Sequence, residues 1–166
     1  MLHSLSRVQL LTGRLGSLEE AWSFFSDPCN LAAITPPWLA FTVTCDPEPM
    51  YAGQIITYTI APFPGLPGLA RLRASWVTEI THVRGPGDVG PDAPLFFVDE
   101  QRLGPYRFWH HQHRFTVEGH GVRMEDEVRY ALPYGPLGDL AHRLMVRRRL
   151  EEIFDYRRAT LAKLMG

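Results

Sequence analysis

The chain has 166 residues, 45% of them hydrophobic and 21% charged, and its 17 basic and 18 acidic side chains give a formal net charge of −1. This balance excludes a general electrostatic attraction for nucleic acid, and the apolar fraction argues against disorder. No run of about 20 apolar residues occurs, so we expect no membrane span. These values predict a single domain over residues 1–166, cytoplasmic by default, and leave a homodimer open.

The first part of the chain predicts one strand followed by two short helices. Residues 3–14 alternate weakly between apolar and polar side chains, which favours a strand. Ser17 with Glu20 three residues later is typical of a capping box at a helix start. Asp27 and Pro28 indicate a second helix that runs to about Ile34.

From residue 38 onward the hydrophobic period is two, which indicates strands near 41–45, 56–60, 72–80, 95–101, 106–118 and 121–132. The period returns to 3.6 after Pro136 and predicts a helix over 137–164. The expected apolar face of that helix comprises Leu140, Leu144, Leu150, Ile153, Phe154, Leu161 and Leu164. This order predicts an α+β fold, in which a curled antiparallel seven-stranded sheet surrounds the long C-terminal helix and leaves a ligand cavity between them.

The strand near 106–118 carries the most informative pattern. Successive side chains of a strand point to opposite faces, so Trp109, His111, His113 and Phe115 share one face. If this face is internal, two imidazoles lie among aromatic rings, where a polar group without a partner costs about 1–3 kcal/mol. We therefore expect a polar site inside an apolar cavity.

The neighbouring strands supply candidate partners. Alternation over 122–132 places Asp126 on the inner face, because the other face is entirely charged. In the strand near 95–101, Phe97, Asp99 and Gln101 share a face that we take to be internal. Neighbouring strands lie about 4.8 Å apart, so these side chains are within reach of the histidines.

Three interpretations of this cluster remain open. It is a closed hydrogen-bond network, or a group that orients one end of a ligand, or a catalytic or metal-binding site. An Asp–His acid/base pair would suit a cyclase, dehydratase or hydrolase, with His111, His113 and Asp126 as candidates. Because His-x-His without a third ligand nearby is a weak metal signal, we expect neither a metal nor a cofactor.

Aromatic side chains complete the predicted cavity. Besides the polar residues above, its expected wall comprises Trp38, Tyr58, Trp76, Phe97, Trp109 and Tyr130. The loops at 62–68, 102–105 and 133–138 are expected to meet at one end of the sheet. They make Phe63, Leu66, Tyr106 and Tyr134 the candidates for the cavity entrance.

Three strings resemble signature segments of one superfamily: FSDPCNLAAITPPW at 25–38, FVDEQRLGPYRFWHHQH at 97–113 and MEDEVRY at 124–130. With the order of elements, they resemble the START-like superfamily, also called SRPBCC or polyketide cyclase/dehydrase-like. The resemblance covers essentially the whole chain and implies the helix-grip fold. It also implies binding of a small hydrophobic molecule, of lipid, polyketide or aromatic type, and for some members catalysis. An accessory role beside a separate enzyme is a further alternative.

Overall fold

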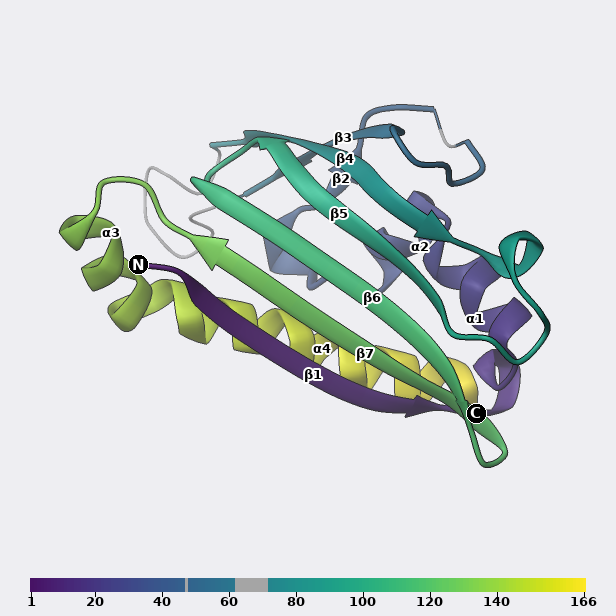
Figure 1. Cartoon of the computed structure of the whole chain (residues 1–166). Helices are drawn as coiled ribbons and strands as arrows, with labels where there is room; N and C mark the ends of the chain where they lie inside the picture. Colours follow the sequence, from purple (N-terminus) through teal and green to yellow (C-terminus); the bar gives the residue numbers. More distant parts are fainter. Residues whose placement is uncertain (47, 62–71) are drawn as a thin grey trace.

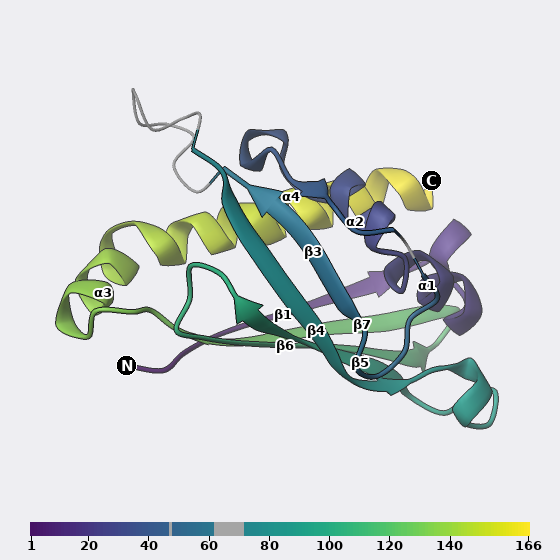
Figure 2. The ribbon, with the colours of Figure 1, turned by 90° about the horizontal axis from the view of Figure 1, so that it is seen from above.

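The computed structural model describes residues 1–46, 48–61 and 72–166. Seven strands form a single antiparallel sheet in the order β1-β7-β6-β5-β4-β3-β2. The strands are β1 His3–Leu11, β2 Thr42–Val43, β3 Ile55–Ile60, β4 Ala74–Arg84, β5 Leu95–Leu103, β6 Phe108–Glu118 and β7 Gly121–Ala131. The sheet curls around the C-terminal helix, which runs along one of its faces (Figures 1 and 2). The predicted α+β helix-grip architecture is confirmed.

Two short helices follow β1, as the sequence predicts, and lie beside the C-terminal part of α4 (Figure 1). Helix α1 is Leu18–Phe25, and Ser17 and Glu20 form the expected capping box. Helix α2 is Pro28–Ala33, and the Asp27 carboxylate accepts a hydrogen bond from the Cys29 N–H at 2.8 Å. Strand β1 ends at Leu11 rather than at residue 14, because a 3₁₀ turn, Gly13–Leu15, begins with a positive φ at Gly13.

The C-terminal helical region is less regular than predicted. Helix α3 spans Pro136–Ala141, a π-helical turn spans His142–Val146, and α4 spans Arg147–Met165. A π-helical turn contains more residues than an α-helical turn. Across it, residues four positions apart therefore lie on the same side of the helix. The residues that face the sheet in this region are therefore Gly138, His142, Val146, Leu150 and Phe154.

This change of phase overturns part of the predicted apolar face. Leu140 and Leu144 are 50% and 73% exposed. Leu164 was also predicted on the inner face and is 39% exposed, but it lies in the last turn of α4, well beyond the π turn. The 3.6-residue period is interrupted at the π turn. Leu140 and Leu144, which the sequence pattern placed on the inner face, therefore point outward. The prediction holds in the second half of the region, where Leu150 and Leu161 are buried.

The hydrophobic core has two parts. The larger joins the two N-terminal helices to the middle of the sheet and to Leu161, and includes Leu11, Ala21, Ile34 and Phe115. The smaller lies under the first half of α4 and contains Val128, Tyr130, Leu150 and Phe154. Part of the space between sheet and helix is left unfilled.

Candidate functional site

That space is a cavity of about 510 Å³. Its walls come from α1 and α2, from the segment around Trp38, from strands β3 to β6 and from the C-terminal helical region. The volume falls in the range of roughly 300–1,000 Å³ that is usual for small-molecule sites. Apolar side chains make up most of the wall, and its polar groups include Asp99, His111 and His113 on the sheet and Arg157 on α4.

Most of the side chains predicted for the wall lie on it: Trp38, Tyr58, Trp76, Phe97, Asp99, Trp109, His111 and His113. Among the described residues, the cavity wall does not include Gln101, Asp126 or Tyr130. The Gln101 amide bonds the Tyr106 backbone twice, donating to the carbonyl at 2.6 Å and accepting from the N–H at 3.2 Å. Tyr130 is 2% exposed, and its hydroxyl pairs with His142 Nε2 at 2.9 Å.

The expected entrance is described in part. Tyr106 and Tyr134 both line the cavity, and Tyr134 is 83% exposed. They lie with Pro105 and Leu137 where two of the three predicted loops meet. Phe63 and Leu66 lie outside the described residues.

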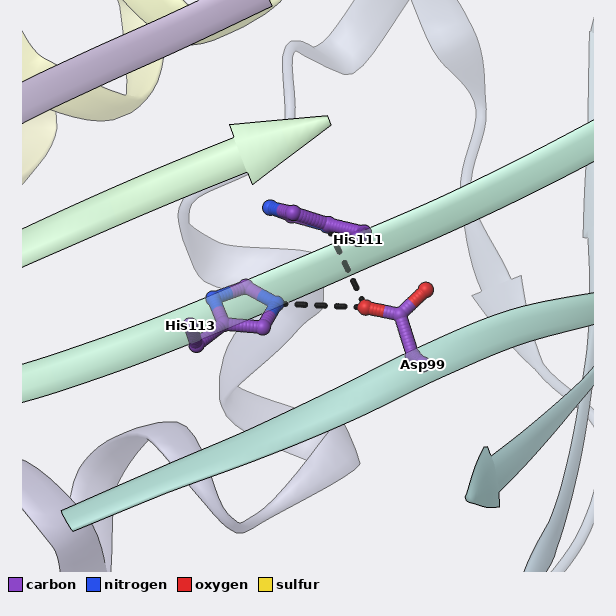
Figure 3. Close-up of side chains that lie close together, drawn as sticks. All are labelled: Asp99, His111 and His113. Carbon is purple, nitrogen blue, oxygen red and sulfur yellow. Dashed lines mark hydrogen bonds and ion pairs between the residues drawn. The ribbon is translucent and has the colours of Figure 1, made fainter. Parts of the chain in front are cut away.

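Two carboxylates and two imidazoles form a network on the sheet side of the cavity. Asp99 on β5 lies beside His111 and His113 on β6, with its carboxylate directed between the two rings (Figure 3). Asp126 on β7 lies on the other side of the rings, directly across from His113 in the β6–β7 register. The registers of three antiparallel strands thus bring together four side chains that alternation placed on one face.

Each imidazole contacts both carboxylates. For His111, Nε2 is 3.1 Å from Asp126 Oδ1 and Nδ1 is 3.2 Å from Asp99 Oδ2. For His113, Nε2 is 3.2 Å from Asp99 Oδ2, and Nδ1 is 2.7 Å from Asp126 Oδ1 without the alignment of a hydrogen bond. The Trp109 indole N–H donates to Asp99 Oδ1 at 3.2 Å. Both oxygens of Asp99 are therefore engaged.

Burial and ion pairing act in opposite directions on these groups. Burial alone raises the pKa of the Asp99 carboxyl, but its contacts with His111 and His113 outweigh burial and hold that pKa well below its usual range. The pKa of Asp126 is lowered in the same way, against burial, mainly by His113. For His111, burial lowers the pKa, and the two carboxylates outweigh it and raise the pKa to about 9. Both acids are thus ionised at neutral pH.

Three further donor groups, on two residues of the wall, have no hydrogen-bond partner among the described residues. They are Trp76 Nε1 and the Nε and Nη1 groups of Arg157. Arg157 is 7% exposed, lies 3.8 Å from Asp126 Oδ2 and stacks over the Phe154 ring. Its role was missed in the sequence, although its position three residues after Phe154 and four before Leu161 places it on the inner face of α4.

Comparisons with known proteins identify the fold and no closer relationship. No family model matches the chain, and no curated protein matches its sequence. Among solved structures, protein Ms6760 of Mycobacterium smegmatis is similar, with 16% identity and a TM-score of 0.60 over 97% of this chain and 92% of that one. A norcoclaurine synthase point mutant of Thalictrum flavum, solved with a transition-state analogue, has 11% identity and a TM-score of 0.60, covering 100% and 98%.

Ara h 8.0201 is also similar, with 11% identity and a TM-score of 0.54 over 98% of this chain and 99% of that one. These neighbours share the helix-grip, Bet v1-like fold. At these identities the likeness establishes the fold alone. In the described part of the chain, no helix is long and apolar enough to cross a membrane.

Proposed function

We propose that the cavity binds a small, largely hydrophobic molecule of lipid, polyketide or aromatic type. The observation that carries the proposal is a largely apolar cavity of about 510 Å³ whose wall holds a small number of polar groups, among them the cluster of Asp99, His111 and His113 on the sheet. Convergent polar groups in an apolar cavity are typical of small-molecule sites, because the apolar wall supplies affinity and the polar groups fix orientation. The proposal includes membership of the START-like, or SRPBCC, superfamily, in which ligand binding is the usual role.

The unpartnered donors indicate the chemistry of the ligand's polar end. Among the described residues, Trp76 Nε1 and the Nε and Nη1 groups of Arg157 have no hydrogen-bond acceptor, whereas both Asp99 oxygens are already engaged. A buried donor without an acceptor costs about 1–3 kcal/mol, so a ligand that brings an acceptor recovers this energy. We therefore expect carboxylates, phenolates or ketones to bind better than amines of the same shape.

A cavity-filling substitution tests this function. Ile153 lines the cavity from α4, so Ile153→Trp should occupy part of the volume and displace the ligand. Leu103→Trp is the matched control, because Leu103 is 60% exposed and does not line the cavity. Binding of fatty acids and naphthoic acids is measured by native mass spectrometry and by the shift in melting temperature. Equal binding by both variants, or no binding by the parent chain, contradicts the proposal.

The second candidate function is a cyclase, dehydratase or hydrolase reaction, and the feature that favours it is the carboxylate-oriented His111 ring on the cavity wall. In such a reaction the imidazole would exchange a proton with the bound molecule. Turnover of a bound ligand that is lost in His111→Gln, with affinity retained, would support catalysis. Unchanged ligand recovered after long incubation with the parent chain would contradict it.

A further inference from the structure

Three ligand-type atoms converge on the sheet wall of the cavity. Asp99 Oδ2 is 3.2 Å from His111 Nδ1 and 3.2 Å from His113 Nε2, and the three atoms lie within 4.8 Å of one another. Figure 3 shows the carboxylate oxygen between the two rings. Atoms that share one metal ion at about 2.1 Å lie roughly 3–4 Å apart, as Asp99 Oδ2 does from each of the two ring nitrogens. The fold thus supplies from β5 the third ligand that the His-x-His pattern lacks in the sequence.

The contact between the His111 ring and Asp99 is attractive only with a positive charge at Nδ1. His111 Nε2 forms a hydrogen bond with Asp126 at 3.1 Å, so in a neutral ring Nε2 carries the only proton. The lone pair of Nδ1 would then lie 3.2 Å from the Asp99 carboxylate, and two negative regions would face each other in a buried site. A second proton on the ring makes the contact attractive, and so does a metal ion in the place of that proton. A divalent ion would supply positive charge to His111, His113 and Asp99 at once.

The surroundings of the three atoms match those of ligands in metal sites. Metal-binding imidazoles usually donate their other N–H to a carboxylate, which fixes the ring orientation. Asp126 Oδ1 bonds His111 Nε2 at 3.1 Å and so takes this role toward His111; it also lies 2.7 Å from His113 Nδ1, without the alignment of a hydrogen bond. The Trp109 N–H holds the second oxygen of Asp99 at 3.2 Å. The His111 ring and the Asp99 carboxylate are thus held from behind, and Asp126 lies beside the His113 ring.

Charge and access favour the Asp99 side over the Asp126 side. Arg157 lies 3.8 Å from Asp126 Oδ2 and disfavours a second cation there. Asp99, His111 and His113 line the cavity, whereas Asp126 does not. An ion beside Asp99 would keep its remaining coordination positions open to water or to ligand oxygens in the cavity.

We propose that Asp99, His111 and His113 bind one divalent transition-metal ion, and that Asp126 orients the two rings. Two imidazoles and one carboxylate suit Zn(II), Co(II) and Fe(II), and the hard ions Mg(II) and Ca(II) are disfavoured. The proposal does not depend on the binding of a hydrophobic ligand. The alternative is that the four side chains form a closed hydrogen-bond network without an ion.

The test uses the full chain, stripped of metal with a chelator and titrated with Co(II). We expect one Co(II) per chain in native mass spectrometry, with visible absorption bands of a bound ion. Asp99→Asn and His113→Gln each remove a ligand and should abolish binding at one equivalent. Asp126→Asn removes only the orienting group and should weaken binding by about 10–100-fold.

The outer face of the same strand pair supplies a matched control. His110 Nδ1 lies 2.9 Å from Glu100 Oε1, which is also a histidine–carboxylate contact between β6 and β5, but it lies outside the cavity. His110→Gln should leave Co(II) affinity unchanged. Circular dichroism establishes that each variant is folded.

Two results would overturn the proposal. One is the absence of a one-to-one complex with the parent chain, which decides the matter even if a variant fails to fold. The other is parental affinity in a folded His113→Gln or Asp99→Asn variant, because the bound ion would then lie elsewhere. Ile153→Trp separates the two proposals: it should remove apolar ligand binding and leave Co(II) binding intact.

Discussion

Asp126 is a buried carboxylate whose Oδ1 contacts both histidine rings and whose Oδ2 lies 3.8 Å from Arg157. Its side chain is 7% exposed, so water does not replace these contacts when they are lost. Removal of one partner from a buried ion pair costs about 3–5 kcal/mol, because the remaining charge stays desolvated. The position is therefore important for stability whether or not the site binds a ligand.

We accordingly predict that Asp126→Asn lowers the free energy of unfolding by about 3–5 kcal/mol. Glu127→Gln is the matched control on the other face of β7, where the exposed pair with Arg129 at 2.7 Å should contribute less than about 1 kcal/mol. Urea denaturation at pH 7 measures both values. Equal losses in the two variants would show that the buried network contributes no more than a surface pair.

Single residues also show how far alternation carries a prediction. A strand has a period of two, so assigning the inner face of β6 placed His111 and His113 inside, and assigning the inner face of β7 placed Asp126 inside. Alternation does not give the register between strands, which decides that Asp99 lies across from His111. Arg157 was missed because an arginine in a helix is usually solvated, although the helical period alone places it on the inner face.

At the scale of elements, the π-helical turn His142–Val146 sets the orientation of the C-terminal region. It turns His142 inward, where Nε2 pairs with the Tyr130 hydroxyl at 2.9 Å and the ring stacks on His3 at 3.5 Å. Hydrophobic periodicity does not reveal such a turn, because the inner positions at and before it, Gly138 and His142, are not large apolar residues. The apolar pattern of Leu140 and Leu144 therefore predicted the wrong face.

The buried position of His142 predicts a pH dependence of stability. Burial is the largest effect that lowers the pKa of His142, and the positive charges of His3 and Arg147 lower it further. Asp139 raises it in part. The folded pKa lies below the unfolded value of about 6.5, so the unfolded chain binds the proton first. The contribution of His142 is therefore complete above about pH 6.5 and is lost as the pH falls below that value.

The variant His142→Gln isolates this contribution. Between pH 7.5 and pH 5 the parent chain should lose more unfolding free energy than His142→Gln, because only the parent has this proton to bind. Urea denaturation across that range measures both curves. Parallel curves would show that His142 titrates alike in the folded and unfolded chains.

At the scale of the whole molecule, the concave face of the sheet and helix α4 depend on each other. Both parts of the core contribute side chains to the cavity wall, and α4 contributes to both parts through Leu161, Leu150 and Phe154. The sequence allowed this architecture to be predicted because each element has a clear period and turn signals separate the strands. The volume left between sheet and helix could not be predicted, because it depends on how the side chains of separate elements meet.

If α4 joins both parts of the core, the chain should unfold as one cooperative unit. Leu161 is fully buried, so Leu161→Ala should cost about 2–5 kcal/mol by loss of contacts and creation of a small cavity. Leu164, one turn later, is 39% exposed, and Leu164→Ala should cost much less.

Far-UV circular dichroism and tryptophan fluorescence follow the sheet and the cavity wall separately during urea denaturation. Because a cooperative domain has no stable half, both signals should move to the same lower midpoint in Leu161→Ala. A fluorescence transition that moves alone would mean that the cavity region unfolds independently of the sheet.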